Sequence, residues 1–180
     1  LIKNGSDFDF EVLNNGNPKQ GIEHVVMVER GKVLPGMLIG AGDSHTAMYG
    51  ALGAVAYGIG TSDIYHYLAT STLRYKKLKN MRVRVTGVRG ISVTAKDIVL
   101  FIVKKLGAGG CTGHCVELCG PVIRDLSVEE RLTLCNMAVE CAARSSIIAP
   151  DQKVFDYLEG REFAPSGEMW PKAVEFWKTL

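Results

Sequence analysis

The sequence lacks any long hydrophobic run and any excess of charge of one sign. Its longest apolar stretch, from Ala51 to Tyr57, contains Gly53 and is far shorter than the roughly 18–20 residues of a membrane-spanning helix. The 180 residues carry a formal net charge of +2, which favours neither a nucleic-acid surface nor a funnel for acidic ligands. We therefore expect a globular protein of one or two small domains, with no membrane and no nucleic acid among its partners.

The chain also lacks a disulfide framework and contains no Cys-x-x-Cys pair. Its five cysteines are an odd number without disulfide-type spacing, which predicts a reducing compartment, the cytoplasm. Four potential metal ligands nevertheless fall within nine residues: Cys111, His114, Cys115 and Cys119. A non-catalytic thiol or metal-binding module is therefore one alternative. Because this spacing matches no usual zinc pattern, we favour buried or redox-inert thiols at all five cysteines.

An initiator methionine and a signal peptide are missing as well. The chain begins Leu1-Ile2-Lys3-Asn4, with no charged start followed by an apolar core. We interpret the sequence as an internal fragment of a longer protein.

Short apolar segments alternate with helical patterns, which predicts an α/β fold with mostly parallel strands. The expected strands cover residues 25–28, 37–39, 81–86, 116–118 and 147–148. The expected helices cover 46–57, 62–73 with Ser62 as its cap, 95–106 opened by Thr94 and Asp97, 127–143 opened by Ser127 and Glu130, and one opened by Asp151. The basic stretch 74–79 is the expected linker, which divides the chain into domains 1–76 and 77–180.

Three consecutive polar residues, Asp43, Ser44 and His45, follow the predicted strand at 37–39. The carboxyl end of a buried strand is where ligands usually bind in α/β sheets. The alternative is a polar turn in which Asp43 or Ser44 caps the next helix.

A second polar pair, Asn136 and Glu140, is spaced four residues apart on one predicted helix, so both should project from the same face. Their neighbours are apolar, and a buried carboxylate is costly unless it has a partner. Spacing alone favours Arg144, four residues further on, as the partner of Glu140.

Several blocks of the chain resemble the aconitase superfamily of iron–sulfur hydro-lyases. The most specific is the run at 42–63, which begins Gly-Asp-Ser-His-Thr. Further matching blocks lie at 21–25, 94–100, 113–117, 123–127, 134–140 and 176–180. Within the superfamily, these blocks are most similar to the large subunits of isopropylmalate dehydratases. The resemblance implies aconitase-like α/β/α layers with mostly parallel sheets.

The resemblance also implies a set of active-site residues: His24, Asp43, Ser44, His45, Asn136 and Glu140. It pairs Asp43 with His24 and Glu140 with His45. A carboxylate that accepts an imidazole N–H fixes the tautomer of the ring, which suits a group that handles a hydroxyl or a departing hydroxide. His66 and His114 are not assigned to the active site, and we expect them to be structural residues.

The implied activity is the interconversion of 2- and 3-isopropylmalate in leucine biosynthesis, by removal and re-addition of water. It would use a [4Fe–4S] cluster, one iron of which acts as a Lewis acid. The cluster cysteines of family members, which include a Cys-x-x-Cys, lie beyond Leu180, so we expect no metal or cofactor ligand in this chain. A separate small subunit is the expected partner, because it carries the serine base.

The chain departs from the family pattern at 48–50, 62–66 and 110–115. These differences leave open another small 2-hydroxy diacid as substrate, namely homocitrate, citramalate or dimethylmalate.

Overall fold

The structure is a computed structural model that describes residues 2–180. Its helical elements are α1 (Ile2–Asp7), α2 (Glu23–Glu29), the 3-10 helix η1 (Ser44–Leu52), α3 (Thr61–Thr70), α4 (Ala95–Leu106), α5 (Pro121–Asp125), α6 (Val128–Met137), the 3-10 helix η2 (Ala138–Cys141), α7 (Gln152–Leu158) and α8 (Met169–Trp177). Its strands are β1 (Leu38–Ala41), β2 (Val55–Gly58), β3 (Lys79–Arg84), β4 (His114–Cys119) and β5 (Ser145–Ile147). Within residues 2–180, no helix is long and apolar enough to cross a membrane.

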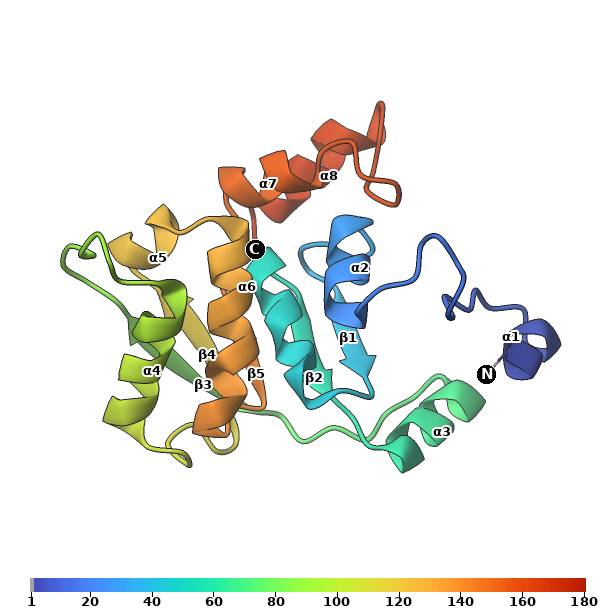
Figure 1. The fold of residues 1–180 in the computed structure, drawn as a ribbon, viewed down its shortest axis with the longest axis horizontal. Coiled ribbons are helices and arrows are strands. Elements are labelled where there is room, and N and C mark those ends of the chain that lie inside the picture. The colour runs from blue at the N-terminus through green and yellow to red at the C-terminus, as the bar shows by residue number, and fades with distance from the viewer. Residues whose placement is uncertain (1) are drawn as a thin grey trace.

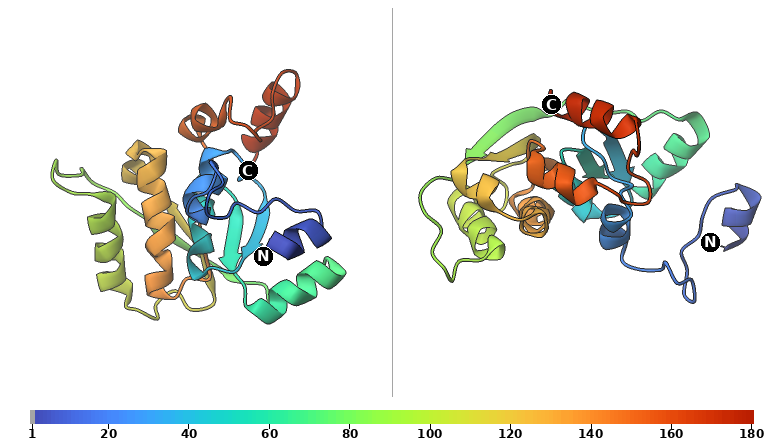
Figure 2. Two further views of the ribbon diagram at one scale, coloured as in Figure 1. Left: turned by 45° about the vertical axis from the view of Figure 1, so that its right-hand side comes forward. Right: turned by 90° about the horizontal axis from the view of Figure 1, so that it is seen from above.

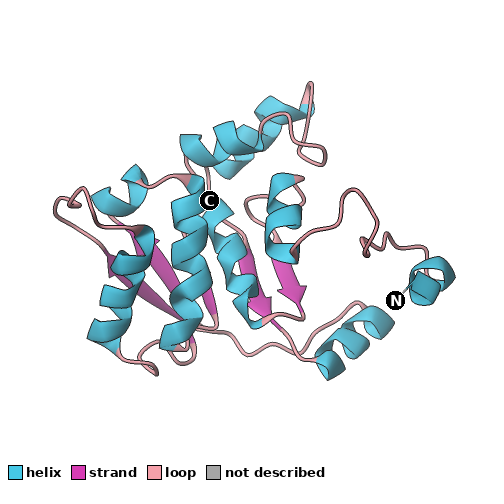
Figure 3. Ribbon diagram, in the orientation of Figure 1, coloured by secondary structure: helices cyan, strands magenta, loops and turns pink. Residues whose placement is uncertain are grey.

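The strands form two parallel sheets, which confirms the predicted α/β class (Figures 1 and 3). β1 pairs with β2, and β4 lies between β3 and β5. The registers place Ile39 opposite Ala56 in the first sheet and Cys115 opposite Ser145 in the second. The two sheets also touch, because the buried Ser145 hydroxyl donates a hydrogen bond of 2.8 Å to the carbonyl of Ala56. The edges of the two sheets are therefore tied together.

One hydrophobic core lies between the β3-β4-β5 sheet and the helices α4 and α6, which run side by side along it (Figures 1 and 2). Val116 and Leu118 come from the central strand, Val99 from α4, and Leu134 from α6. All four are at most 3% exposed. Alternation along β4 explains the pattern, since Val116 and Leu118 are buried while Glu117 between them is exposed.

A second core joins segments from both ends of the chain. Val28 of α2 and Tyr49 of η1 pack with Val154 and Phe155 of α7 and with Trp177 of α8. Helices α7 and α8 lie beside α2, although more than 100 residues separate them in sequence (Figure 1). This core includes residues from both sides of the expected boundary at 76, and the division into domains 1–76 and 77–180 stays a prediction.

Two expected strands differ in the structure. Residues 25–28 belong to helix α2 instead of a strand, with Val28 1% exposed and Val25 45% exposed; a short apolar run does not distinguish a helix from a strand by its periodicity. The strand expected at 37–39 exists as β1, but Leu38 is 71% exposed. β1 pairs only with β2 within the described residues, so its outer side is open.

The long helix expected at 46–57 was also wrong in extent. The chain forms η1 up to Leu52, and Gly53 then adopts a left-handed conformation at φ 81° that ends the helix. Val55 and the residues that follow it form β2. Helix α3 begins at Thr61 and ends at Thr70, and its cap position is Gly60 instead of Ser62. The small and β-branched residues at 53–56 have no periodicity that separates a helix from a strand.

The other three helix starts predicted from polar residues were correct. Thr94 with Asp97 and Ser127 with Glu130 each form a reciprocal capping box, and the Asp151 side chain accepts from the backbone N–H of Val154. The helix expected to run to 143 is α6, which tightens into the 3-10 geometry of η2 after Met137. A loop at residues 107–113 joins α4 to β4.

Asp151 also holds the most deeply buried charge of the described chain. The Arg131 guanidinium, 0% exposed, donates to both carboxylate oxygens of Asp151, at 2.8 and 2.6 Å. A third bond of 3.0 Å runs from Arg131 to the carbonyl of Arg124. Burial raises the pKa of Asp151, but the hydrogen bonds and charge of Arg131 outweigh it and leave the pKa below its ordinary value.

Replacement of Asp151 by alanine should therefore lower the free energy of unfolding by about 3–5 kcal/mol, because it leaves a buried guanidinium uncompensated and removes a helix cap. Urea denaturation measures the change, with Glu159→Ala, at the exposed C-cap position of α7, as control. Since the pKa of Asp151 is lowered, its contribution is complete above the pKa of the unfolded chain and is lost as pH falls through the folded value. A loss below 1 kcal/mol for Asp151→Ala would contradict this account.

Candidate active site

The candidate site begins where β1 ends, at the Asp43 turn. The Asp43 carboxylate accepts a 2.7 Å hydrogen bond from the backbone N–H of His45 and thereby caps η1. The Thr46 hydroxyl donates to the Asp43 carbonyl at 2.6 Å. The capping alternative is therefore correct, but it does not use up the carboxylate, because the same Oδ1 atom also faces His24. Asp43 serves as both a helix cap and a polar partner.

His24 reaches this carboxylate from α2, with Nε2 3.0 Å from Asp43 Oδ1. A carboxylate can only accept, so Nε2 carries the proton in this contact. The other ring nitrogen, Nδ1, is buried and has no hydrogen-bond partner within residues 2–180. The Tyr49 ring packs edge-on against His24, with ring centroids 5.8 Å apart and an interplanar angle of 87°. Packing and pairing together fix the orientation of His24.

The neighbours of Asp43 keep it ionised. The backbone N–H of His45 is the largest influence and lowers the pKa of Asp43, burial acts in the opposite direction, and the His24 hydrogen bond lowers the pKa further. A fixed negative charge is therefore present beside two imidazole rings. Under Asp43, Gly58 of β2 leaves room for the turn, because a Cβ there would lie 2.5 Å from the Asp43 carbonyl oxygen.

His45 connects this turn to the second half of the chain. Its Nε2 lies 3.9 Å from Glu140 Oε1, its Nδ1 lies 3.7 Å from Asp43 Oδ1, and the Ser44 hydroxyl lies 3.2 Å from the same Nδ1. Both expected pairs, His24 with Asp43 and His45 with Glu140, are thus close in space. Glu140 itself is exposed, so the expectation of a buried carboxylate was wrong. Within residues 2–180 it forms no ion pair with Arg144.

Asn136 stands apart from this cluster. Its side-chain amide lies 3.7 Å from the sulfur of Met48, at the contact between α6 and η1. Asn136 belongs to α6 and Glu140 to η2, and the spacing rule for one α-helix does not apply across the change to 3-10 geometry. The structure therefore brings five of the six predicted residues into one chain of contacts and places Asn136 beside it.

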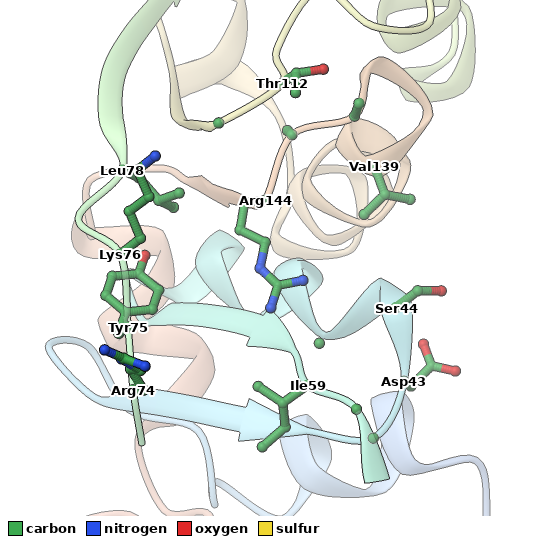
Figure 4. A pocket seen from close by; sticks show the side chains of 16 residues that line it. Asp43, Ser44, Ile59, Arg74, Tyr75, Lys76, Leu78, Thr112, Val139 and Arg144 are labelled. Carbon is green, nitrogen blue, oxygen red and sulfur yellow. The ribbon is translucent and has the colours of Figure 1, made fainter. Parts of the chain in front are cut away.

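A cleft of about 710 Å³ opens between the two sheets next to these residues (Figure 4). Asp43 and Ser44 lie on one wall, and Arg74, Lys76 and Arg144 line it from the other side. Sequence reasoning missed the three cations, because it read 74–79 as a linker and Arg144 as a partner of Glu140. The only signal was that basic stretch, and nothing in the sequence shows that it folds back along the cleft.

The cysteines do not form a metal site. Cys111, Cys135 and Cys141 are buried, and burial raises the pKa of each of these thiols. Within residues 2–180, no three His, Cys, Asp or Glu side chains lie close enough to hold one metal ion. The His114 Nδ1 atom lies 2.9 Å from the Thr112 carbonyl, and His66 contacts the Thr72 hydroxyl at 3.3 Å. These residues therefore do not fit a [4Fe–4S] cluster, and the metal-binding module has no support here.

Two carboxylates and two imidazoles that alternate in space can move protons. Each imidazole has a carboxylate to orient it, and the exposed His45–Glu140 end is open to a reactant. The cationic wall of the neighbouring cleft suits an anionic molecule.

Comparison with known proteins identifies the family of this chain. The chain is 56% identical over 178 residues to the 3-isopropylmalate dehydratase large subunit 1 of Mannheimia succiniciproducens. That match covers 99% of this chain but spans only 38% of the length of the curated relative. The aconitase family (aconitate hydratase) matches residues 1–180. The chain belongs to the aconitase family.

Proposed function

We propose that this chain is part of the large subunit of a 3-isopropylmalate dehydratase, which interconverts 2- and 3-isopropylmalate by dehydration and rehydration in leucine biosynthesis. The observation that carries the proposal is the continuous set of contacts from His24 through Asp43 and His45 to Glu140. Removal of water from a 2-hydroxy acid takes a hydroxyl and a proton from neighbouring carbons, and this set offers oriented groups that accept and donate protons.

In this proposal, Asp43 orients His24 and His45, and the two imidazoles hold the protons. Glu140 faces His45 Nε2 and fixes the outer end of that ring. Ser44 lies beside His45 Nδ1 and contributes a hydroxyl that can donate to a substrate oxygen. Asn136 supports the arrangement from α6 by its contact with η1. All of these roles are assigned to residues of this chain.

Two components of the complete enzyme lie outside the described residues. A [4Fe–4S] cluster would supply Lewis-acid chemistry when bound, and its ligands would come from elsewhere in the large subunit, because the thiols present here do not fit one. A small subunit would complete the enzyme as a heterodimer, a partner that fits the name of the relative as a large subunit. Free thiols and a biosynthetic role favour the cytoplasm as its location.

The test is a comparison of substrates. The complete large subunit, expressed with its small subunit and reconstituted anaerobically, is assayed for dehydration of isopropylmalate, homocitrate, citramalate and dimethylmalate. We expect the highest kcat/KM for isopropylmalate. A higher value for any of the other three diacids would overturn the assignment of substrate, and no dehydration of any of them would overturn the proposed activity.

A further inference from the structure

One wall of the cleft beside the candidate active site carries three positive charges, and no carboxylate within residues 2–180 forms an ion pair with any of them. Arg74 and Lys76 are exposed on the extended segment between α3 and β3, and Arg144 precedes β5. Within residues 2–180, none of the three side chains forms a hydrogen bond or an ion pair. Because like charges that converge on one cleft repel each other, such an arrangement favours an anionic occupant.

Arg144 is held in place by aromatic packing instead of by a carboxylate. Its guanidinium carbon lies 5.5 Å from the centre of the Tyr57 ring, and Tyr57 stacks on Tyr75 with ring centres 4.9 Å apart. Tyr57, the ring that contacts Arg144, is only 3% exposed and is enclosed by the protein, whereas Tyr75 is 43% exposed. Figure 4 shows the guanidinium pointing into the cleft, between the Tyr75 ring on one side and Ser44 on the other.

The nearest carboxylate in sequence does not claim this side chain. Glu140 is exposed and lies four residues before Arg144, a spacing at which pairs commonly form on helices. Glu140 instead faces His45, at 3.9 Å. The guanidinium therefore keeps its planar set of donors available toward the cleft, in the geometry that matches a carboxylate with two parallel bonds.

We propose that Arg144 binds a carboxylate of the substrate, with Arg74 and Lys76 adding positive charge to the same wall. The inference rests on the proposed function and assigns the cationic side of its site. A 2-hydroxy diacid has carboxylates to anchor and a hydroxyl to expel. The cationic wall would hold one carboxylate, and the substrate would then extend toward Asp43 and Ser44 on the opposite wall.

Calorimetric binding of isopropylmalate to the complete two-subunit enzyme tests this assignment without a need for turnover. Arg144→Gln should raise the Kd by about 10- to 100-fold, because it removes a charge-assisted pair of hydrogen bonds. Arg144→Lys should recover part of the loss, since a lysine keeps the charge but not the planar fork. Arg82→Gln is the matched control, because Arg82 is exposed on β3, outside the cleft.

A substrate analogue sharpens the test. Wild-type enzyme should bind isopropylmalate more tightly than an analogue with one carboxylate converted to a primary amide, and Arg144→Gln should bind the two with similar Kd values. The analogue used is the monoamide that the wild-type enzyme discriminates against most strongly. If Arg144→Gln binds isopropylmalate as wild type does, or keeps the full discrimination, the inference is wrong.

Different results would contradict the role of Arg144 and the proposed function. Binding that depends on Arg144, without dehydration of isopropylmalate, would count against the proposed function alone. Dehydration with a Kd that does not depend on Arg144 would count against the inference alone. A wild-type enzyme that binds no small diacid would overturn both.

Discussion

Replacement of Asp43 by asparagine in the complete enzyme is expected to lower kcat by about 10²- to 10⁴-fold, the range associated with loss of an oriented proton-transfer group. This substitution removes the charge but keeps the helix cap, because asparagine still offers an oxygen to the backbone N–H of His45 at the start of η1. What disappears is the negative charge between His24 and His45. Steady-state turnover of isopropylmalate measures the effect, with thermal unfolding to show that the fold is retained.

Asp63→Asn provides the matched control for this substitution. Asp63 is exposed in the first turn of α3, and its replacement should leave kcat unchanged. The lowered pKa of Asp43 also has a consequence: the carboxylate stays ionised until the pH falls below the usual range of an aspartate. Titration of Asp43 should therefore not limit wild-type activity near neutral pH. A folded Asp43→Asn enzyme with a wild-type kcat would contradict the assigned role.

The 180-residue chain by itself is expected to bind no [4Fe–4S] cluster and to show no turnover. Within residues 2–180, none of its five thiols belongs to a group of three or more side chains that could hold one metal ion. Loss of metal polarisation removes several kcal/mol of transition-state stabilisation. Because each ~1.4 kcal/mol is a factor of ten in rate, residual activity should fall below background.

Anaerobic reconstitution of the purified chain with iron and sulfide, followed by absorbance spectroscopy and an isopropylmalate assay, provides the measurement. The complete two-subunit enzyme, treated identically, is the positive control. A cluster absorbance band from the isolated chain would point to the segment from Cys111 to Cys119 as ligands. In that case Cys115→Ser should abolish the band, and the view that the ligands lie elsewhere would be wrong.

Local features of the fold were predictable where one short segment contains the whole signal. Thr94 with Asp97, and Ser127 with Glu130, are self-contained capping pairs, and the structure has both. Residues 25–28 misled the prediction because their apolar, β-branched composition favours a strand, whereas they form part of α2, and so short a run has no periodicity that separates the two. At 46–57 the left-handed Gly53 divides the segment into η1 and β2, and this conformation has no local sequence signature beyond the glycine itself.

The candidate site likewise has residues that one short segment predicts and residues that it does not. Consecutive polar residues at the end of a predicted strand were enough to single out Asp43, Ser44 and His45. Their pairing with His24 and Glu140 came from resemblance, because contacts between residues distant in sequence depend on the packing of η1 against α6. The cationic wall was missed, since exposed basic residues in a segment without regular structure usually face solvent. Only the path of that segment, and the stacking of Arg144 on Tyr57, place these charges at the cleft.

We propose that residues from the two halves of the chain form one catalytic site, and a double-mutant cycle between His45 and Glu140 tests whether they act together. The measurement is kcat for isopropylmalate dehydration by the complete enzyme carrying His45→Gln, Glu140→Gln or both. Residues that act as a unit give non-additive losses, so the double variant should be about as slow as the slower single variant. Losses that multiply, or single variants with wild-type kcat, would contradict a shared site.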